Sequence, residues 1–328
     1  MTGAERWYRR MVTGTLVFVV LLVFVGAIVR ATGAGLGCPD WPKCWGQLIP
    51  PWKTSQVDLE KIDFERFRKK AERLGRDPDS VTPERIMESF NPVHTWTEFV
   101  NRVVSLPVGF FSLGAVVVGF GLPRKNRALL LGLAVVGLLI VLVNAVMGAM
   151  VVYSGLKPGI ITLHLALAMG LLGLLVFCRW KVAGSERHEG GRVLFRVVCG
   201  LLGLVFIEGV MGAQVRELTD ELAKSHRGEE RAEWIGELEE SAVYLAHRSF
   251  SWLIVLGMGV AFWMAKKRGV VTPAVLVLAG LVLAMMVMGV VLAHVGVFPW
   301  VQVLHVGLAA IMLVLLCDWA LKLWPARA

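Results

Sequence analysis

The sequence has few charged residues: lysine, arginine, aspartate and glutamate make up only 18% of its 328 residues. Hydrophobic residues make up 56%, and the mean hydropathy is +0.66. A chain with so little polar material cannot cover the surface of a water-soluble globule. Its apolar runs also reach the roughly 20 residues that cross a bilayer. We therefore expect an all-α polytopic membrane protein.

Cysteine is scarce as well, with five in the chain. Cys38 and Cys44 follow the first apolar run, and no other cysteine or histidine lies near them in sequence. Because a structural zinc ion takes about four protein ligands, this pair cannot complete a zinc site. We expect a disulfide between them, with two free thiols as the alternative. The other three cysteines fall near expected cytoplasmic ends of spans, where thiols stay reduced: Cys178, Cys199 and Cys317.

Acidic residues are outnumbered, 25 against 34 basic ones, and the net charge is +9. Such a balance can indicate nucleic-acid binding, but here the basic residues lie in short segments between apolar runs, where they mark the cytoplasmic side. We expect a lipid bilayer as the surrounding partner, no nucleic acid, and both termini in the cytoplasm. The basic segments are Arg6/Arg9/Arg10, 124–127, 179–192, 266–268 and Lys322/Arg327.

Eight apolar segments are long enough to cross a bilayer as helices. The first follows three arginines, as a signal peptide would, but its apolar run from Met11 to Val29 exceeds the usual 7–15 residues, so we expect it to be retained. The polar segments 32–96 and 216–242 are expected to be outer loops. In the first of them, Thr82 and Pro83 are typical of a helix start. The expected spans are approximately 11–31, 99–122, 128–152, 159–180, 193–215, 243–265, 273–294 and 300–322.

The spans repeat as two halves. The turn and helix start around His164 recur around His305, and a Met-Gly pair precedes each histidine by the same interval. Gly26 and Arg30 match Gly212 and Arg216, and the Asn101-Arg102 pair matches His247-Arg248. We therefore expect two repeated four-helix bundles, residues 1–180 and 190–328. The small residues of the odd-numbered spans are expected to be mainly packing seams.

The C-terminal half carries a pair of histidines within apolar spans. A histidine in such a segment is costly and usually functional. His247 and His305 lie in the first turns of two spans that run in the same direction, so we expect them at similar depth near the outer face. Two imidazoles can hold one metal, and haem fits best because a helix bundle needs to supply only its axial ligands. Arg216 and Arg248 at the same level could pair with haem propionates.

In the N-terminal half the matching pair is Asn101 and His164, flanked by Arg30 and Arg102. Asparagine is a poor ligand for haem iron, so His164 is the one strong candidate ligand here. A pocket with a single strong ligand is typical of a site that carries out a reaction rather than one that only carries electrons. This half is therefore predicted to hold the reaction site.

Glu98 lies one helical turn before Asn101, on a similar face, and is a candidate for moving protons. The alternative is a structural ion pair with Arg102, four residues further on. His94, seven residues before Asn101, could also reach the site. Glu208 lies inside the fifth span and has no assigned role.

The segment from Val29 to Cys44 resembles the end of the first span and the start of the first outer loop of the haem A synthases. Glu98, Asn101 and Arg102 resemble their Glu-x-x-His-Arg motif, although this chain has asparagine where the motif has histidine. The residues that match the remaining family histidines are His164, His247 with Arg248, and His305.

The resemblance implies oxidation of the C8 methyl group of haem O to a formyl group through hydroxylation steps, which gives haem A for terminal oxidases. It also implies a haem b cofactor held by two histidines in the C-terminal half, and substrate haem with a catalytic Glu98 in the N-terminal half. The expected location is the plasma membrane. Haem O synthase and an electron donor are candidate partners.

Two alternatives belong to other functional classes. A b-type membrane cytochrome that acts only in electron transfer would hold two permanent haems and would prefer paired histidines in both halves, which Asn101 argues against. A haem transporter or chaperone would share the pockets but would not need Glu98. Incubation with haem O and oxygen separates these functions, because only a synthase forms a formyl haem.

Overall fold

The computed structural model describes the whole chain except residues 74–76, 185–186, 227 and 326–328, so Arg327 lies outside the described residues. The described part is all-helical, and it contains eight helices long and apolar enough to cross a membrane. The expected spans are confirmed as helices, and the protein is an all-α multi-pass membrane protein. The eight helices are α1 (Gly3–Ala31), α4 (Pro92–Gly119), α5 (Arg124–Tyr153), α6 (Ile160–Ala183), α7 (Gly191–Ser225), α9 (Ala242–Lys267), α10 (Pro273–His294) and α11 (Pro299–Lys322).

Three helices are longer than expected. α1 starts at Gly3 because Thr2 and Glu5 form a capping box, and α4 starts at Pro92 because Asn91 caps it. α7 continues to Ser225. The polar segments 32–96 and 216–242, expected as outer loops, are therefore partly continuations of these helices, because residues 92–96 and 216–225 are helical. A change to polar sequence ends the apolar part of a span, but it does not end a helix whose backbone remains hydrogen-bonded.

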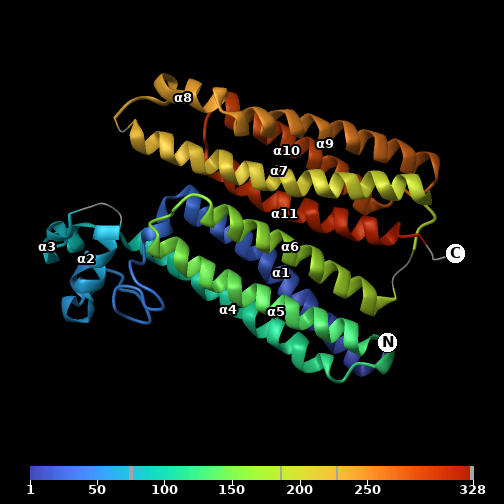
Figure 1. Cartoon of the computed structure of the whole chain (residues 1–328), viewed down its shortest axis with the longest axis horizontal. Coiled ribbons are helices and arrows are strands. Elements are labelled where there is room, and N and C mark those ends of the chain that lie inside the picture. The colour runs from blue at the N-terminus through green and yellow to red at the C-terminus, as the bar shows by residue number, and fades with distance from the viewer. Residues whose placement is uncertain (74–76, 185–186, 227, 326–328) are drawn as a thin grey trace.

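The helices gather into two groups, α1, α4, α5 and α6 in one and α7, α9, α10 and α11 in the other (Figure 1). In each group every helix packs mainly against two others, which makes a ring: α1–α4–α5–α6 and α7–α9–α10–α11. Within a ring, α4 lies diagonally from α6, and α9 from α11. The groups meet along α1, α6, α7 and α11.

The N-terminus and the end of α11 lie at one end of the bundle, and the short helices α2 (Phe64–Arg73), α3 (Pro83–Glu88) and α8 (Arg231–Glu240) lie at the other, which we call the loop end (Figure 1). The Thr82 side chain accepts a hydrogen bond from the Arg85 backbone N–H at the start of α3, as expected. Four 3-10 helices complete the described structure: Ala34–Leu36, Thr54–Gln56, Leu59–Lys61 and Pro78–Ser80.

The segment between α1 and α4 has a small apolar core of its own, separate from the core of the membrane helices. This core fixes the loop against the start of α4, beside the candidate site. Its buried members are Cys38, Cys44, Trp45, Val57, Ile62, Ile86 and Phe90.

Candidate functional site

The two histidines of the C-terminal half lie near the starts of α9 and α11, both at the loop end. Each imidazole lies against a glycine of a neighbouring helix. A Cβ added to Gly212 would lie 3.2 Å from Cε1 of His247, and one added to Gly289 would lie 3.8 Å from Cε1 of His305. The two histidines come from diagonal helices of one ring.

The N-terminal half has the same arrangement around Asn101 and His164. A Cβ on Gly148 would lie 3.7 Å from Cε1 of His164, and one on Gly26 would lie 4.0 Å from Oδ1 of Asn101. That Oδ1 atom is buried and makes no hydrogen bond to any residue the structure describes. Each candidate ligand position thus has a glycine beside it. The small residues expected to be packing seams also leave room for these side chains.

Glu208 lies beside His247. Its Oε1 atom is 3.2 Å from Nδ1 of His247 and accepts a hydrogen bond from the Ser251 hydroxyl. Ser251 lies one turn after His247 on α9, and Glu208 lies one turn before Gly212 on α7. These spacings could have identified the cluster in the sequence, where Glu208 had no assigned role.

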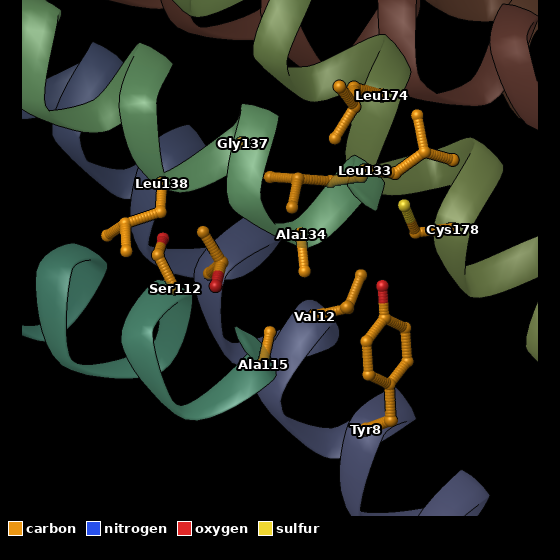
Figure 2. A pocket seen from close by; sticks show the side chains of 12 residues that line it. Tyr8, Val12, Ser112, Ala115, Leu133, Ala134, Gly137, Leu138, Leu174 and Cys178 are labelled. Atoms are coloured by element: carbon orange, nitrogen blue, oxygen red, sulfur yellow. The ribbon is translucent and has the colours of Figure 1, made fainter. Parts of the chain in front are cut away.

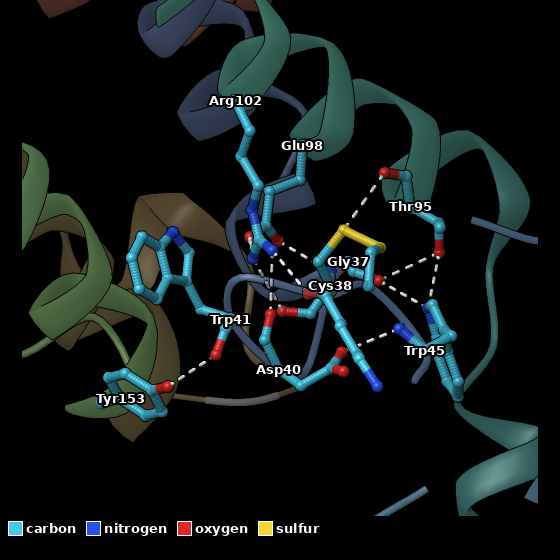
Figure 3. A network of polar contacts seen from close by, with 11 residues as sticks. Gly37, Cys38, Asp40, Trp41, Trp45, Thr95, Glu98, Arg102 and Tyr153 are labelled. Carbon is cyan, nitrogen blue, oxygen red and sulfur yellow. Dashed lines mark hydrogen bonds and ion pairs between the residues drawn. A yellow bond between two sulfur atoms is a disulfide. The ribbon is translucent and has the colours of Figure 1, made fainter. Parts of the chain in front are cut away.

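Glu98 is buried, with 3% of its surface exposed, and it joins α4 to the loop that precedes it (Figure 3). Its Oε2 atom accepts a hydrogen bond from the Cys38 backbone N–H at 2.7 Å, and its Oε1 atom accepts one from Nη2 of Arg102 at 2.5 Å. The ion pair with Arg102 that the sequence left open is therefore formed.

Arg102 spans the loop closed by the Cys38–Cys44 disulfide, which is present as expected (Figure 3). Its Nη1 atom donates to the backbone carbonyls of Asp40 at 2.9 Å and Lys43 at 2.8 Å. A guanidinium has five N–H donors in a rigid planar fork, which suits it to several carbonyls at once. Nothing in the sequence indicated this use of Arg102, because the acceptors are backbone atoms of a loop.

The arginines at the matching ends of α1 and α7 share one carboxylate. Asp220 accepts a hydrogen bond from Nη2 of Arg30 at 3.1 Å and forms an ion pair with Arg216, whose Nη2 atom lies 2.8 Å from Oδ1 of Asp220. Sequence reasoning did not single out Asp220, although it lies four residues after Arg216 on the same helix. Arg248 is exposed on α9, next to His247.

A second carboxylate of α7 supports the helix that carries His164. α6 begins after Gly159, whose hydrogen side chain cannot cap it. Glu217 of α7 instead accepts hydrogen bonds from the backbone N–H groups of Gly159 at 3.0 Å and Thr162 at 3.1 Å. A carboxylate at a helix N-terminus also complements the helix dipole. This contact between the halves was not predicted, because nothing in the sequence pairs Glu217 with α6.

His94 is partly exposed in the first turn of α4, nearly two turns before Asn101. A small cavity lies elsewhere, between α1, α4, α5 and α6 near the chain termini, and apolar side chains form most of its lining (Figure 2). None of the candidate site residues lines it. Among the described residues, no three histidines, cysteines, aspartates or glutamates group as a metal site would require.

Comparison with known proteins identifies the chain's relatives. The sequence profile of the cytochrome oxidase assembly proteins, COX15-CtaA, matches residues 9–317. The chain is 24% identical to the haem A synthase of Rhizorhabdus wittichii, over 93% of this chain and 90% of that protein. It is also 24% identical to the haem A synthase of Listeria welshimeri, over 92% and 91%. Its 26% identity to the haem A synthase of Shewanella oneidensis covers 49% of this chain and only 42% of that protein.

Proposed function

The chain belongs to the cytochrome oxidase assembly protein family COX15-CtaA, and from this we propose that it is a haem A synthase. It is a membrane oxidoreductase that converts the C8 methyl group of haem O to a formyl group. The full-length similarity to two proteins named haem A synthase supports the reaction. The observation that carries the site assignment is the glycine beside each of Asn101, His164, His247 and His305.

The C-terminal half fits a haem b cofactor. His247 and His305 come from diagonal helices, and Gly212 and Gly289 leave space beside their rings. The Nδ1 atom of His305 is buried and makes no hydrogen bond within the described chain, which is costly for a side chain with no bound partner. We assign both histidines as axial ligands. The two imidazoles would hold the haem iron, and the haem would supply one-electron chemistry when bound.

The N-terminal half would take haem O as its substrate. His164 is the one strong ligand, and Asn101 lies in the place that His247 has in the other half. The buried Oδ1 of Asn101 has no partner among the described residues, so it is available to a bound molecule. A single strong ligand lets a substrate enter and leave more readily than a pair does. This difference assigns the reaction to residues 1–180 and the permanent cofactor to residues 190–328.

Glu98 is proposed as the catalytic carboxylate. The Cys38 N–H and the Arg102 guanidinium fix its two oxygens one helical turn from Asn101. Held there, Glu98 could take up a proton at Oε1 or Oε2 and pass it on during oxidation of the substrate. General acid–base help of this kind is typically worth about 10²–10⁴-fold in rate. The disulfide loop then holds the carboxylate of Glu98 in a fixed position.

The four arginines at this level are proposed to pair with haem propionates: Arg30 and Arg102 in the substrate half, and Arg216 and Arg248 in the cofactor half. Arg248 is exposed, so a propionate could pair with it without displacing a buried contact. A propionate would have to share Arg30 and Arg216 with Asp220. Arg102 already donates to Glu98 and to loop carbonyls, so its main role would be to orient Glu98.

The basic segments at the end of the bundle that holds the N-terminus and the end of α11 support a cytoplasmic location for that end in the plasma membrane. The haem sites then lie near the outer face. Haem O synthase, which would make the substrate, and an electron donor are the proposed partners.

The test is to purify the protein, extract its haems and identify them by mass, then to incubate it aerobically with haem O and a reductant. Formation of a formyl haem supports the synthase. Two haem b molecules that never exchange, with no product, would favour a cytochrome that only carries electrons. Exchange of haem O without oxidation would favour a transporter or chaperone.

A further inference from the structure

Glu208 is a carboxylate within a membrane span, and the proposed function leaves it without a role. Its side chain is only 13% exposed. A charged group in such a place is costly, and where one occurs it usually has a partner and a function. The partners of Glu208 are the Nδ1 atom of His247, 3.2 Å from its Oε1 atom, and the hydroxyl of Ser251.

Helix α7 therefore contacts His247 in two ways. Gly212 lies against Cε1 of the ring, and one turn earlier Glu208 lies against Nδ1. Ser251, one turn after His247, lies 2.9 Å from the carbonyl oxygen of His247 and donates to Glu208. The 3.2 Å contact is not aligned as a hydrogen bond, because the buried Nδ1 atom of His247 has no hydrogen-bond partner among the described residues. A proton on Nδ1 facing Glu208 would leave the Nε2 atom as the ligand. Histidines that bind metals commonly donate their other ring N–H to a carboxylate in this way.

The other three candidate ligand positions lack this carboxylate. The residues four positions before the glycines of α1, α5 and α10 are Leu22, Asn144 and Met285. Asn144, whose backbone lies near His164, has an uncharged side chain. The Nδ1 atoms of His164, His247 and His305 are all buried without a hydrogen-bond partner in the described structure. Of the three, that of His247 is the one that lies against a described carboxylate.

We propose that Glu208 is a positioning residue that tunes the haem of the C-terminal half, an inference that rests on the proposed function. With its carboxylate oxygen 3.2 Å from Nδ1, Glu208 favours the tautomer that carries the proton on Nδ1 and makes the imidazole a stronger electron donor to iron. Negative charge beside a ligand stabilises the ferric more than the ferrous state, so it lowers the midpoint potential of this haem. In the substrate half the corresponding position beside Asn101 is Leu22, so this means of tuning is absent there.

The experiment is a spectroelectrochemical titration of the purified, haem-loaded protein and its Glu208→Gln variant. Glutamine keeps the size of the side chain but removes the charge. We expect a low-spin spectrum in both proteins and a higher midpoint potential in the variant. Glu233→Gln, which removes an exposed carboxylate from α8 at the same end of the molecule, is the matched control and should leave the potential close to that of the unmodified protein.

Ser251→Ala separates tuning from helix packing. Removal of the hydroxyl frees Glu208 to interact more strongly with His247, so the potential should stay the same or fall. If Glu208 only joined α7 to α9, both Glu208→Gln and Ser251→Ala would lower the melting temperature and neither would change the potential.

An unchanged potential in haem-loaded Glu208→Gln overturns the proposal. If that variant does not retain haem, Glu208→Asp must restore the low-spin haem, because it restores the charge, and failure to do so also overturns the proposal. Absence of low-spin haem from the unmodified protein would instead refute the proposed function, so the two failures are distinguishable.

Discussion

The Glu98 side chain can make a structural contact and also take part in the reaction. Its oxygens accept bonds from Cys38 and Arg102, which is the structural ion pair that the sequence offered as an alternative to catalysis. The contact does not exclude catalysis, because a carboxylate must be held still to act on a substrate. The residue-scale question is whether activity needs the charge or only the hydrogen bonds.

Glu98→Gln answers it. The glutamine oxygen can still accept a hydrogen bond, but the amide cannot take up a proton in the neutral range. Formation of formyl haem should fall by about 10²–10⁴-fold, while the low-spin spectrum of the C-terminal haem stays unchanged. Product is measured by mass after incubation with haem O.

Glu88→Gln, at an exposed position of α3, is the control and should be fully active. Full activity in Glu98→Gln would remove Glu98 from the catalytic assignment. Loss of the C-terminal haem as its main effect would show that the two halves do not divide the work as proposed.

At the scale of single elements, a membrane helix serves as a scaffold for the side chains of its neighbours. α7 contributes a glycine and a carboxylate to His247 of α9, and another carboxylate caps α6. Small residues allow close approach of membrane helices, and here the approach brings α7 up to an imidazole. Two predictions concern this helix.

Gly212→Val should displace His247. Because a Cβ at position 212 would already lie 3.2 Å from the ring, the larger valine overpacks the contact at a cost of about 1–3 kcal/mol. The expected result is loss or reduced occupancy of the low-spin haem. Gly200→Val is the control on the same helix, since a Cβ there meets no atom within 4 Å. Equal haem content in both variants would contradict the proposed contact.

Glu217→Ala should destabilise the start of α6. Two backbone N–H groups lose their partner, and the one of Thr162 is buried, where an unsatisfied donor costs about 1–3 kcal/mol. We expect a lower melting temperature in detergent, and weaker binding of haem O because His164 lies in this turn. Glu217→Gln keeps one acceptor and should lose less. Glu221→Ala, exposed one turn further along α7, should behave like the unmodified protein, and a Glu217→Ala variant as stable as this control would contradict the capping role.

At the scale of the whole molecule, α7 links the two groups of helices at the loop end. Asp220 bridges Arg30 of α1 and Arg216 of α7, and Glu217 reaches α6. Both contacts involve charged groups at the level of the candidate haem sites. These contacts tie α7 to α1 and α6 at the loop end.

The orientation in the membrane is the fourth prediction. The basic segments predict that the end of the bundle with the N-terminus and the end of α11 faces the cytoplasm. A reporter fused to the C-terminus should be active only in its cytoplasmic form, and a tag within residues 53–91 should be reached by reagents from outside the cell. Labelling of intact cells measures both. A C-terminus that is accessible from outside would reverse the orientation and move the haem sites to the inner face.

The sequence by itself determined the number of spans and predicted the candidate ligands and Glu98, because both depend on local chemistry: apolar length sets a span, and a polar side chain within one is conspicuous. It also favoured the Cys38–Cys44 disulfide, since no other ligand lay near.

Only the tertiary structure decided which groups meet across helices. It paired Arg30 and Arg216 with Asp220, Glu208 with His247, and Glu217 with the start of α6. It also showed that Arg102 donates hydrogen bonds to backbone carbonyls of the disulfide loop. These partners are distant in sequence or are backbone atoms, which have no residue-specific signature. Helix packing brings them within hydrogen-bond distance, and the sequence pattern does not specify which residues of different helices will lie that close.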